Sequence, residues 1–182
     1  MSFFSKIWGK KPSGTPFNAG KQARDPARYE EEKIMARSKS AKERLAVAEN
    51  PKTHQEILYY LADDESETVR RAIASNPSTP VHISRSLAED SDIDVKLALI
   101  QRLTSLLPDL SQDQYAHLYA YAAQALGILA LDEVLKVRLA LSSALKDELY
   151  APPEVAAQLA KDLERQVSEP ILRLCSAVPD EV

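Results

Sequence analysis

Two neighbouring stretches of the chain follow one plan: ERLAVAENPKTHQEILYYLADDESETV, residues 43–69, and VRRAIASNPSTPVHISRSLAEDSDIDV, residues 69–95. Asn50 in the first stretch returns as Asn76 in the second, each followed by proline, so the period is 26 residues. Self-similarity at such a period is typical of repeat proteins, in which every unit is one supersecondary structure. The plan therefore predicts stacked copies of a short structural unit.

Each unit reads as a helix, a turn and a second helix. Ser66 is a favourable N-cap, and Val69 and Ile73 follow it on one helical face. The Asn-Pro pair ends this helix, because a residue that precedes proline avoids the α region. Thr79 is then expected to cap the second helix, with Pro80 at its first position.

The composition favours helices throughout. Glycine, which tight β-turns need, occurs only 4 times in 182 residues, and three of the four lie within the first twenty. The lone cysteine excludes an intramolecular disulfide and suits a reducing compartment. No apolar run approaches the roughly 20 residues of a membrane span. We therefore expect an all-α protein of the cytoplasm.

The repeat pattern breaks after the third start and then resumes, which gives four complete helix pairs and one half, beginning near residues 40, 66, 92, 134 and 164. A single amphipathic pair cannot bury its apolar face alone, whereas stacked neighbours bury it jointly. The predicted fold is a short right-handed α-solenoid over residues 28–182, preceded by a disordered basic tail over residues 1–27.

A recurring pair of charges adds a family resemblance. An aspartate stands six residues before a basic residue that follows valine, which resembles the HEAT-repeat pattern. The short units with Asn-Pro turns also resemble the leucine-rich-repeat-variant family, and residues 137–182 resemble a bacterial HEAT-like domain family without an assigned function. The resemblance implies an acid–base ladder between repeats and no catalytic residues. The ladder residues are Asp64, Arg70, Asp90, Lys96, Asp132 and Arg138.

Residues that could support catalysis or bind a metal are scattered. His54, His82 and His117 lie in different repeats without a second ligand at metal spacing, so we expect solvated or cap-side histidines. Cys175 lies among apolar residues, as a buried thiol would. Since nucleotide-binding and nucleophile motifs are absent, we expect no enzyme activity, no metal and no cofactor.

Two aromatic groups are candidate contact sites. Tyr115 and Tyr119 share the apolar stripe of one helix, where they serve either the core or a partner surface, while Tyr121 falls off that stripe. The N-terminal segment, residues 1–11, combines apolar and basic side chains. It is a tail without contacts, a tether to an anionic membrane or a ligand for a groove. Its candidate contact residues are Phe3, Phe4, Ile7, Trp8, Lys6, Lys10 and Lys11.

The charge distribution limits the class of partner. Residues 1–28 carry six basic residues and one acidic residue, whereas the remainder has a net charge of −9 within a total of −4. An acidic body argues against nucleic-acid binding, which requires neutralisation of phosphates. We expect a non-catalytic protein–protein interaction scaffold. The alternative is a membrane-peripheral adaptor at the inner face, tethered by residues 1–11, and the remote alternative is an enzyme.

The end of the chain suggests self-association. Residues 164–178 read as the first helix of a fifth unit whose covering helix is missing. An uncovered apolar face is unusual on a monomer, and two such faces can pair with C2 symmetry. The covering helix is expected either in sequence beyond residue 182 or in another molecule, and for the second case we expect a homodimer through the C-terminal helix. The apolar positions of that helix are Val167, Ile171, Leu172, Leu174 and Val178.

Overall fold

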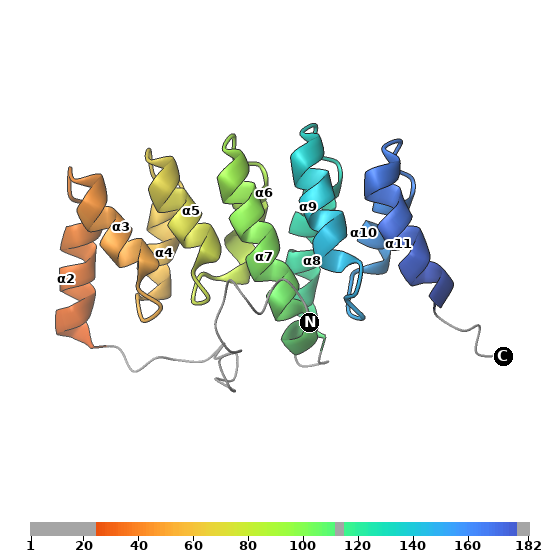
Figure 1. Cartoon of the computed structure of the whole chain (residues 1–182). Coiled ribbons are helices and arrows are strands. Elements are labelled where there is room, and N and C mark those ends of the chain that lie inside the picture. Colours follow the sequence, from red (N-terminus) through yellow and green to blue (C-terminus); the bar gives the residue numbers. More distant parts are fainter. Residues whose placement is uncertain (1–24, 112–114, 178–182) are drawn as a thin grey trace, which may run out of the picture.

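The computed structural model describes residues 25–111 and 115–177, and every regular element within these two ranges is helical (Figure 1). The protein is therefore all-α, as predicted. Its elements are α2 (Pro26–Ala36), α3 (Ala41–Glu49), α4 (Gln55–Leu61), α5 (Glu67–Ser75), the 3-10 helix η1 (Val81–Ile83), α6 (Ser84–Ala88), α7 (Ile93–Leu110), α8 (Ala116–Ala130), α9 (Leu135–Leu145), α10 (Pro153–Ala160) and α11 (Arg165–Ala177).

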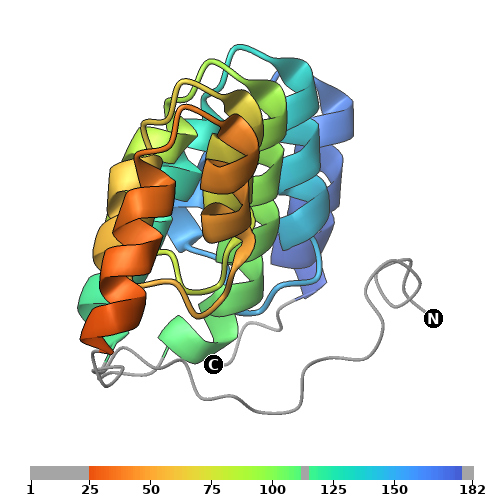
Figure 2. The same ribbon diagram turned by 90° about the vertical axis from the view of Figure 1, so that its left-hand side faces the viewer.

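The helices form two layers (Figure 2). In the first layer α3, α5, α7, α9 and α11 pack side by side in chain order. In the second layer α2 packs on α4, and α6, α8 and α10 follow one another. Because α2 belongs to the second layer, it precedes the first repeat as an additional half-unit. It also begins at Pro26, two residues before the predicted start of the folded region.

One continuous apolar core lies between the two layers. In α5, Val69 and Ile73 of the predicted face are buried. Ala72, which the same spacing places on that face, is only partly buried, whereas Ala74, which the spacing leaves out, is fully buried. Every helix of both layers contributes apolar side chains that are fully or almost fully buried, and α2 contributes only one of them, Ala36. The largest fully buried side chains are Leu58, Leu61, Ile73, Leu87, Leu99, Ile100, Leu103, Leu107, Leu110, Leu126, Leu129 and Leu141.

The threonines after the Asn-Pro turns do not cap the second helices. The hydroxyl of Thr79 donates instead to the carbonyl of Ile73 at 2.7 Å, and that of Thr53 donates to the carbonyl of Val47 at 2.7 Å. In a continuous helix each carbonyl would accept the N–H four residues later, but that residue is a proline and has no N–H. The threonine therefore supplies the donor that the proline lacks, and His54 is the N-cap residue of α4.

The third unit breaks the period because its turn signal is missing. Arg102 stands 26 residues after Asn76, and a leucine replaces the following proline. Without proline the backbone can continue its hydrogen bonds, and α7 runs on to Leu110. The Arg102 guanidinium is buried and donates to the carbonyl of Thr79 at 2.7 Å and to the hydroxyl of Ser84 at 2.9 Å.

The last helix is better covered than the sequence suggests. Val167 and Ile171 are fully buried in the core, since α11 packs on both α9 and α10. These two residues therefore do not belong to an uncovered face, and that part of the expectation is wrong. Leu172 is about half exposed, at 52%. The side chain of Leu174 and residue Val178 lie outside the described part of the chain.

Candidate functional site

The charged ladder links successive units through their side chains. Arg70 Nε lies 2.7 Å from a carboxylate oxygen of Asp90, which belongs to the next unit. Its Nη1 donates to the backbone carbonyl of Asp64, six residues earlier, at 2.8 Å. Each of the three arginines thus binds a carbonyl of its own turn and pairs with the following turn, whereas Lys96 makes the pair with the following turn. The four pairs are Arg44–Asp64, Arg70–Asp90, Lys96–Asp132 and Arg138–Asp162.

The ladder residues named from the sequence omit Arg44 and Asp162, because a serine replaces the expected partner in the spacing at each end, Ser38 before Arg44 and Ser168 after Asp162. Ser38 takes the aspartate's place before Arg44: its carbonyl accepts from the guanidinium, and its hydroxyl accepts the N–H of Ser40 at 3.0 Å. The 26-residue period could have identified Arg44 as a member of the ladder, since Arg44 lies 26 residues before Arg70. All four basic side chains are engaged in these pairs.

Two carboxylates of the ladder have altered acidity. Burial works against ionisation of Asp90, yet the hydrogen bonds from Arg70 and from the backbone N–H of Asp92 outweigh it and lower the pKa of Asp90. The pKa of Asp162 is lowered in the same way, by Arg138 and the N–H of Glu164 against the effect of burial. Both carboxylates are therefore held ionised, which is what a structural ion pair requires.

The three tyrosines of α8 divide between core and surface. Tyr115 and Tyr119 are partly buried against the core. The Tyr119 hydroxyl donates to the carbonyl of Tyr150 at 3.1 Å, and burial, aided by the charge of Glu154, raises the pKa of Tyr119. Tyr121 is 45% exposed. Of the three, Tyr121 is therefore the side chain available to a partner.

Tyr121 lies beside aromatic side chains of other repeats. Its ring centroid is 6.5 Å from that of His82 in η1, and the His82 ring is 6.0 Å from that of Tyr59 in α4. His82 is exposed, and Tyr59 is 59% exposed. These three side chains form a surface row across three elements of the second layer, which we call the aromatic strip. Sequence reasoning missed Tyr59 and His82 as members.

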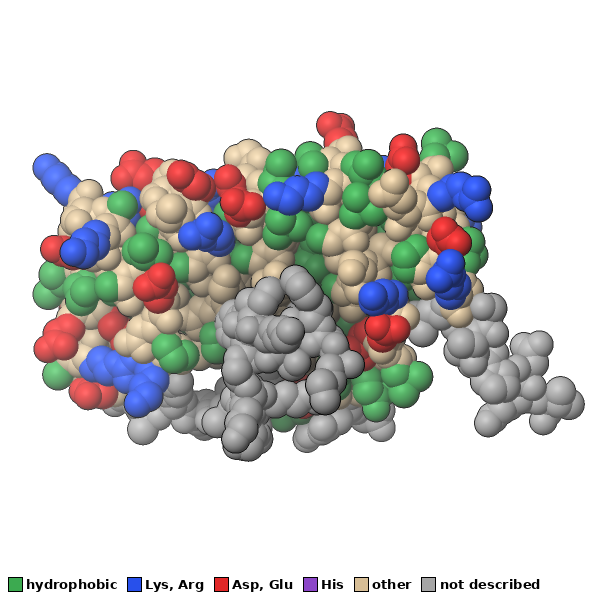
Figure 3. All heavy atoms as spheres, in the orientation of Figure 1, with side chains coloured by type: hydrophobic (Ala, Val, Ile, Leu, Met, Phe, Trp, Pro, Cys, Tyr) green, Lys and Arg blue, Asp and Glu red, His purple; other side chains and the backbone are tan. Residues whose placement is uncertain are grey.

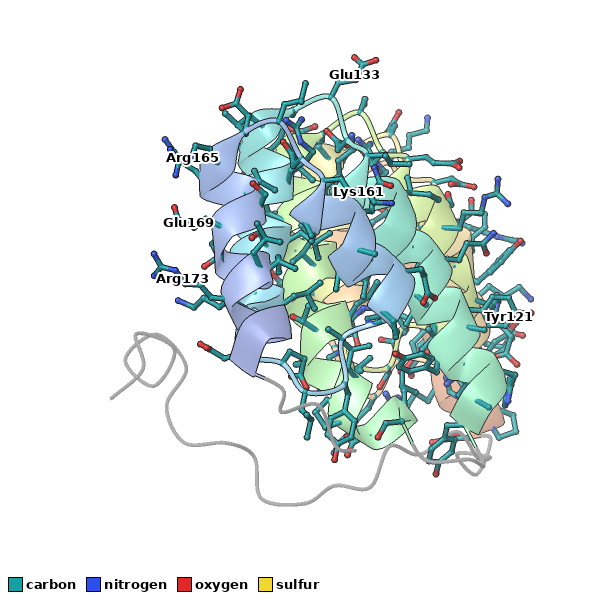
Figure 4. The ribbon with its side chains drawn as sticks, turned by 90° about the vertical axis from the view of Figure 1, so that its right-hand side faces the viewer. Tyr121, Glu133, Lys161, Arg165, Glu169 and Arg173 are labelled. Atoms are coloured by element: carbon teal, nitrogen blue, oxygen red, sulfur yellow. The ribbon has the colours of Figure 1, made fainter. Side chains whose placement is uncertain are left out.

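The helix that carries Tyr121 has no charge. Residues 115–131 contain no Asp, Glu, Lys or Arg, although charged residues make up 27% of the chain. Figure 4 places Tyr121 on the outer side of α8, at the opposite edge of the molecule from the labelled side chains of α11. The first-layer face, by contrast, displays acidic and basic side chains (Figure 3). A solvent-facing helix without charge matches the depletion of charged residues at interface cores.

A second polar cluster joins α2 to α4. One Glu32 carboxylate oxygen accepts the backbone N–H of His54 at 2.9 Å and lies 2.7 Å from His54 Nδ1. The other accepts from Arg28 Nε at 2.9 Å, and the Tyr29 ring packs edge-on against the imidazole. His54 is therefore buried, which corrects the expectation of solvent exposure, although it does lie at a helix cap. The contacts of this cluster hold α2 against α4, and its buried side chains are not accessible to a ligand.

Several predicted positions cannot be placed. Phe3, Phe4, Lys6, Ile7, Trp8, Lys10 and Lys11 lie outside the described residues, and so does the side chain of Cys175. Residues 25–111 and 115–177 contain no cluster of His, Cys, Asp and Glu side chains that could hold a metal ion. Within the same ranges no helix has the length and apolarity that crossing a membrane requires. The chain matches no protein-family model, and searches of curated proteins and of solved structures found no match.

Proposed function

We propose that the chain is a short right-handed α-solenoid of HEAT-like repeats that acts as a non-catalytic scaffold and binds a protein partner through the aromatic strip. The observation that carries this proposal is the uncharged outer face of α8 with its exposed Tyr121, continued by His82 and Tyr59 on neighbouring elements. The alternation of two helical layers supports the solenoid.

The chemistry of the strip favours a protein ligand. Tyrosine offers a large apolar area with little loss of conformational entropy, and its hydroxyl stays hydrogen-bonded at a wet rim. Three rings in a row, at steps of 6.0 and 6.5 Å, match the distance of about 6.7 Å between alternate residues of an extended peptide. An extended segment lying across the repeats could therefore place every second side chain on a ring.

Affinity capture with matched variants tests the proposal. The strip variant carries Tyr59→Ser and Tyr121→Ser. The control variant carries Leu149→Ser and Leu163→Ser, which are exposed apolar residues, 80% and 97%, in the turns before and after α10. We expect the wild type and the control variant to capture the same partner protein, and the strip variant to capture at least tenfold less of it. Equal retention by all three would refute the strip, provided that their circular dichroism and melting temperatures agree.

A further inference from the structure

We infer that residues 1–11 of the same chain occupy the aromatic strip in the free protein and compete with its partner. The inference rests on the proposed role of the strip as a docking surface and names its resident ligand. The observations behind it are the chemistry of the strip, the charge that surrounds it and the point at which the N-terminal segment joins the fold.

The two surfaces are chemically complementary. Residues 1–24 contain five basic residues and no acidic residue. The stretch that surrounds Tyr59, residues 53–69, contains no lysine or arginine, and its Glu56 and Asp63 are exposed. The lysines of the N-terminal segment would therefore meet the carboxylates of Glu56 in α4 and of Asp63 in the turn that follows it. Phe4 and Trp8 would meet the uncharged face of α8. Attraction between opposite charges guides such contacts, and burial of aromatic area stabilises them.

The connection is long enough. Residues 12–24 connect the N-terminal segment to α2. Helix α2 lies in the same layer as the strip and packs directly on α4 (Figure 1). Packed helices are about 8–10 Å apart, so α8 lies about 30 Å from α2, three helix steps along the layer. Residues 12–24 can span about 45 Å when extended. Residues 1–11 can thus reach every ring of the strip without any displacement of α2.

The single tryptophan of the chain, Trp8, reports on this contact in the full-length protein. We expect its fluorescence to be blue-shifted, with an acrylamide quenching constant several-fold below that of N-acetyltryptophanamide. The strip variant Tyr59→Ser with Tyr121→Ser should raise the quenching constant to within twofold of the free compound. The control variant Leu149→Ser with Leu163→Ser should leave it unchanged.

Three outcomes would overturn the inference. Trp8 of the wild type could be quenched as fast as the free compound, which would mean that it is not docked. Protection that survives the strip variant would place the contact elsewhere, and protection lost on dilution would assign it to a second copy of the chain. None of these outcomes affects the proposed function, which fails only if partner capture is insensitive to the strip. If the strip binds a partner and residues 1–11 compete with it, the variant Phe4→Ser with Trp8→Ser should capture more partner than the wild type.

Discussion

At the scale of single residues, the repeat depends on side chains that replace missing backbone hydrogen bonds. Asn76 Nδ2 donates to the carbonyl of Ala48 at 2.7 Å and to that of Asn50 at 3.0 Å, which ties one turn to the preceding one. The Ile73 carbonyl accepts the Asn76 N–H at 3.2 Å, and the Thr79 hydroxyl donates to it at 2.7 Å in place of the N–H that Pro77 lacks. A buried carbonyl without a partner is costly, so these positions are constrained by hydrogen bonding as well as by packing.

Thr79→Val tests this constraint at nearly constant shape. The substitution removes the shorter of the two hydrogen bonds to the buried Ile73 carbonyl, which keeps the bond from the Asn76 N–H. We expect the free energy of unfolding to fall by about 1 kcal/mol, the net value of one hydrogen bond, measured by urea denaturation. Thr68→Val, on the exposed side of α5, is the control and should change it by less than about 0.5 kcal/mol. Equal effects of both substitutions would show that the hydroxyl of Thr79 is dispensable.

The lowered pKa values of Asp90 and Asp162 predict sensitivity to acid. A carboxylate whose pKa is lower in the folded than in the unfolded state stabilises the fold above its unfolded value, near 3.8. This stabilisation is lost as the pH falls through the folded pKa. We expect the melting temperature to decline below about pH 4, and Asp90→Asn to flatten that decline while lowering stability at pH 7. An unchanged acid profile in Asp90→Asn would exclude this carboxylate as a cause.

At the scale of elements, the sequence predicts those helices whose ends carry local signals. Asn-Pro pairs end α3 and α5, and Asp92 caps α7 through hydrogen bonds to the N–H groups of Asp94 and Val95. Helix α2 could not be found in this way, because its buried residues are only Glu32 and Ala36 and no apolar period marks it. Its attachment depends on a partner 22 residues away, which periodicity cannot reveal.

The attachment of α2 is therefore expected to depend on polar contacts. His54→Ala removes the imidazole that contacts both Glu32 and Tyr29, and leaves the buried carboxylate with fewer partners. We expect amide hydrogen exchange across Pro26–Ala36 to accelerate by at least tenfold, while exchange in α7 is unchanged. Glu31→Gln, an exposed change in the same helix, is the control and should have no effect. Unaltered exchange in His54→Ala would show that Ala36 and Tyr29 suffice to hold α2.

At the scale of the whole molecule, the position of each helix among its neighbours determines which side chains form the aromatic strip and how stable each helix is. The sequence could set Tyr121 apart from the core stripe, but it could not join it to His82 and Tyr59, because their proximity arises only when three second-layer elements stand side by side. Stability follows the same geometry. Among the described helices, α7 packs on α5, α6, α8 and α9, whereas α11 packs on α9 and α10. In arrays whose units contact only their neighbours, terminal units open at lower free energy than central ones.

Matched core truncations in these two helices measure how far the stack unfolds as a unit. Leu103→Ala in α7 and Ile171→Ala in α11 each remove a fully buried side chain. Such changes lower the free energy of unfolding of the structure around them by about 2–5 kcal/mol. We expect Leu103→Ala to lower amide protection in α3, α5, α9 and α11 alike, because it weakens the centre on which both halves depend. Ile171→Ala should release α11 and leave protection in α3 and α5 within twofold of the wild type, as hydrogen exchange with mass spectrometry can resolve. If Ile171→Ala instead lowers protection equally in α3 and α5, the helices fold as one cooperative unit and the nearest-neighbour account of this stack is wrong.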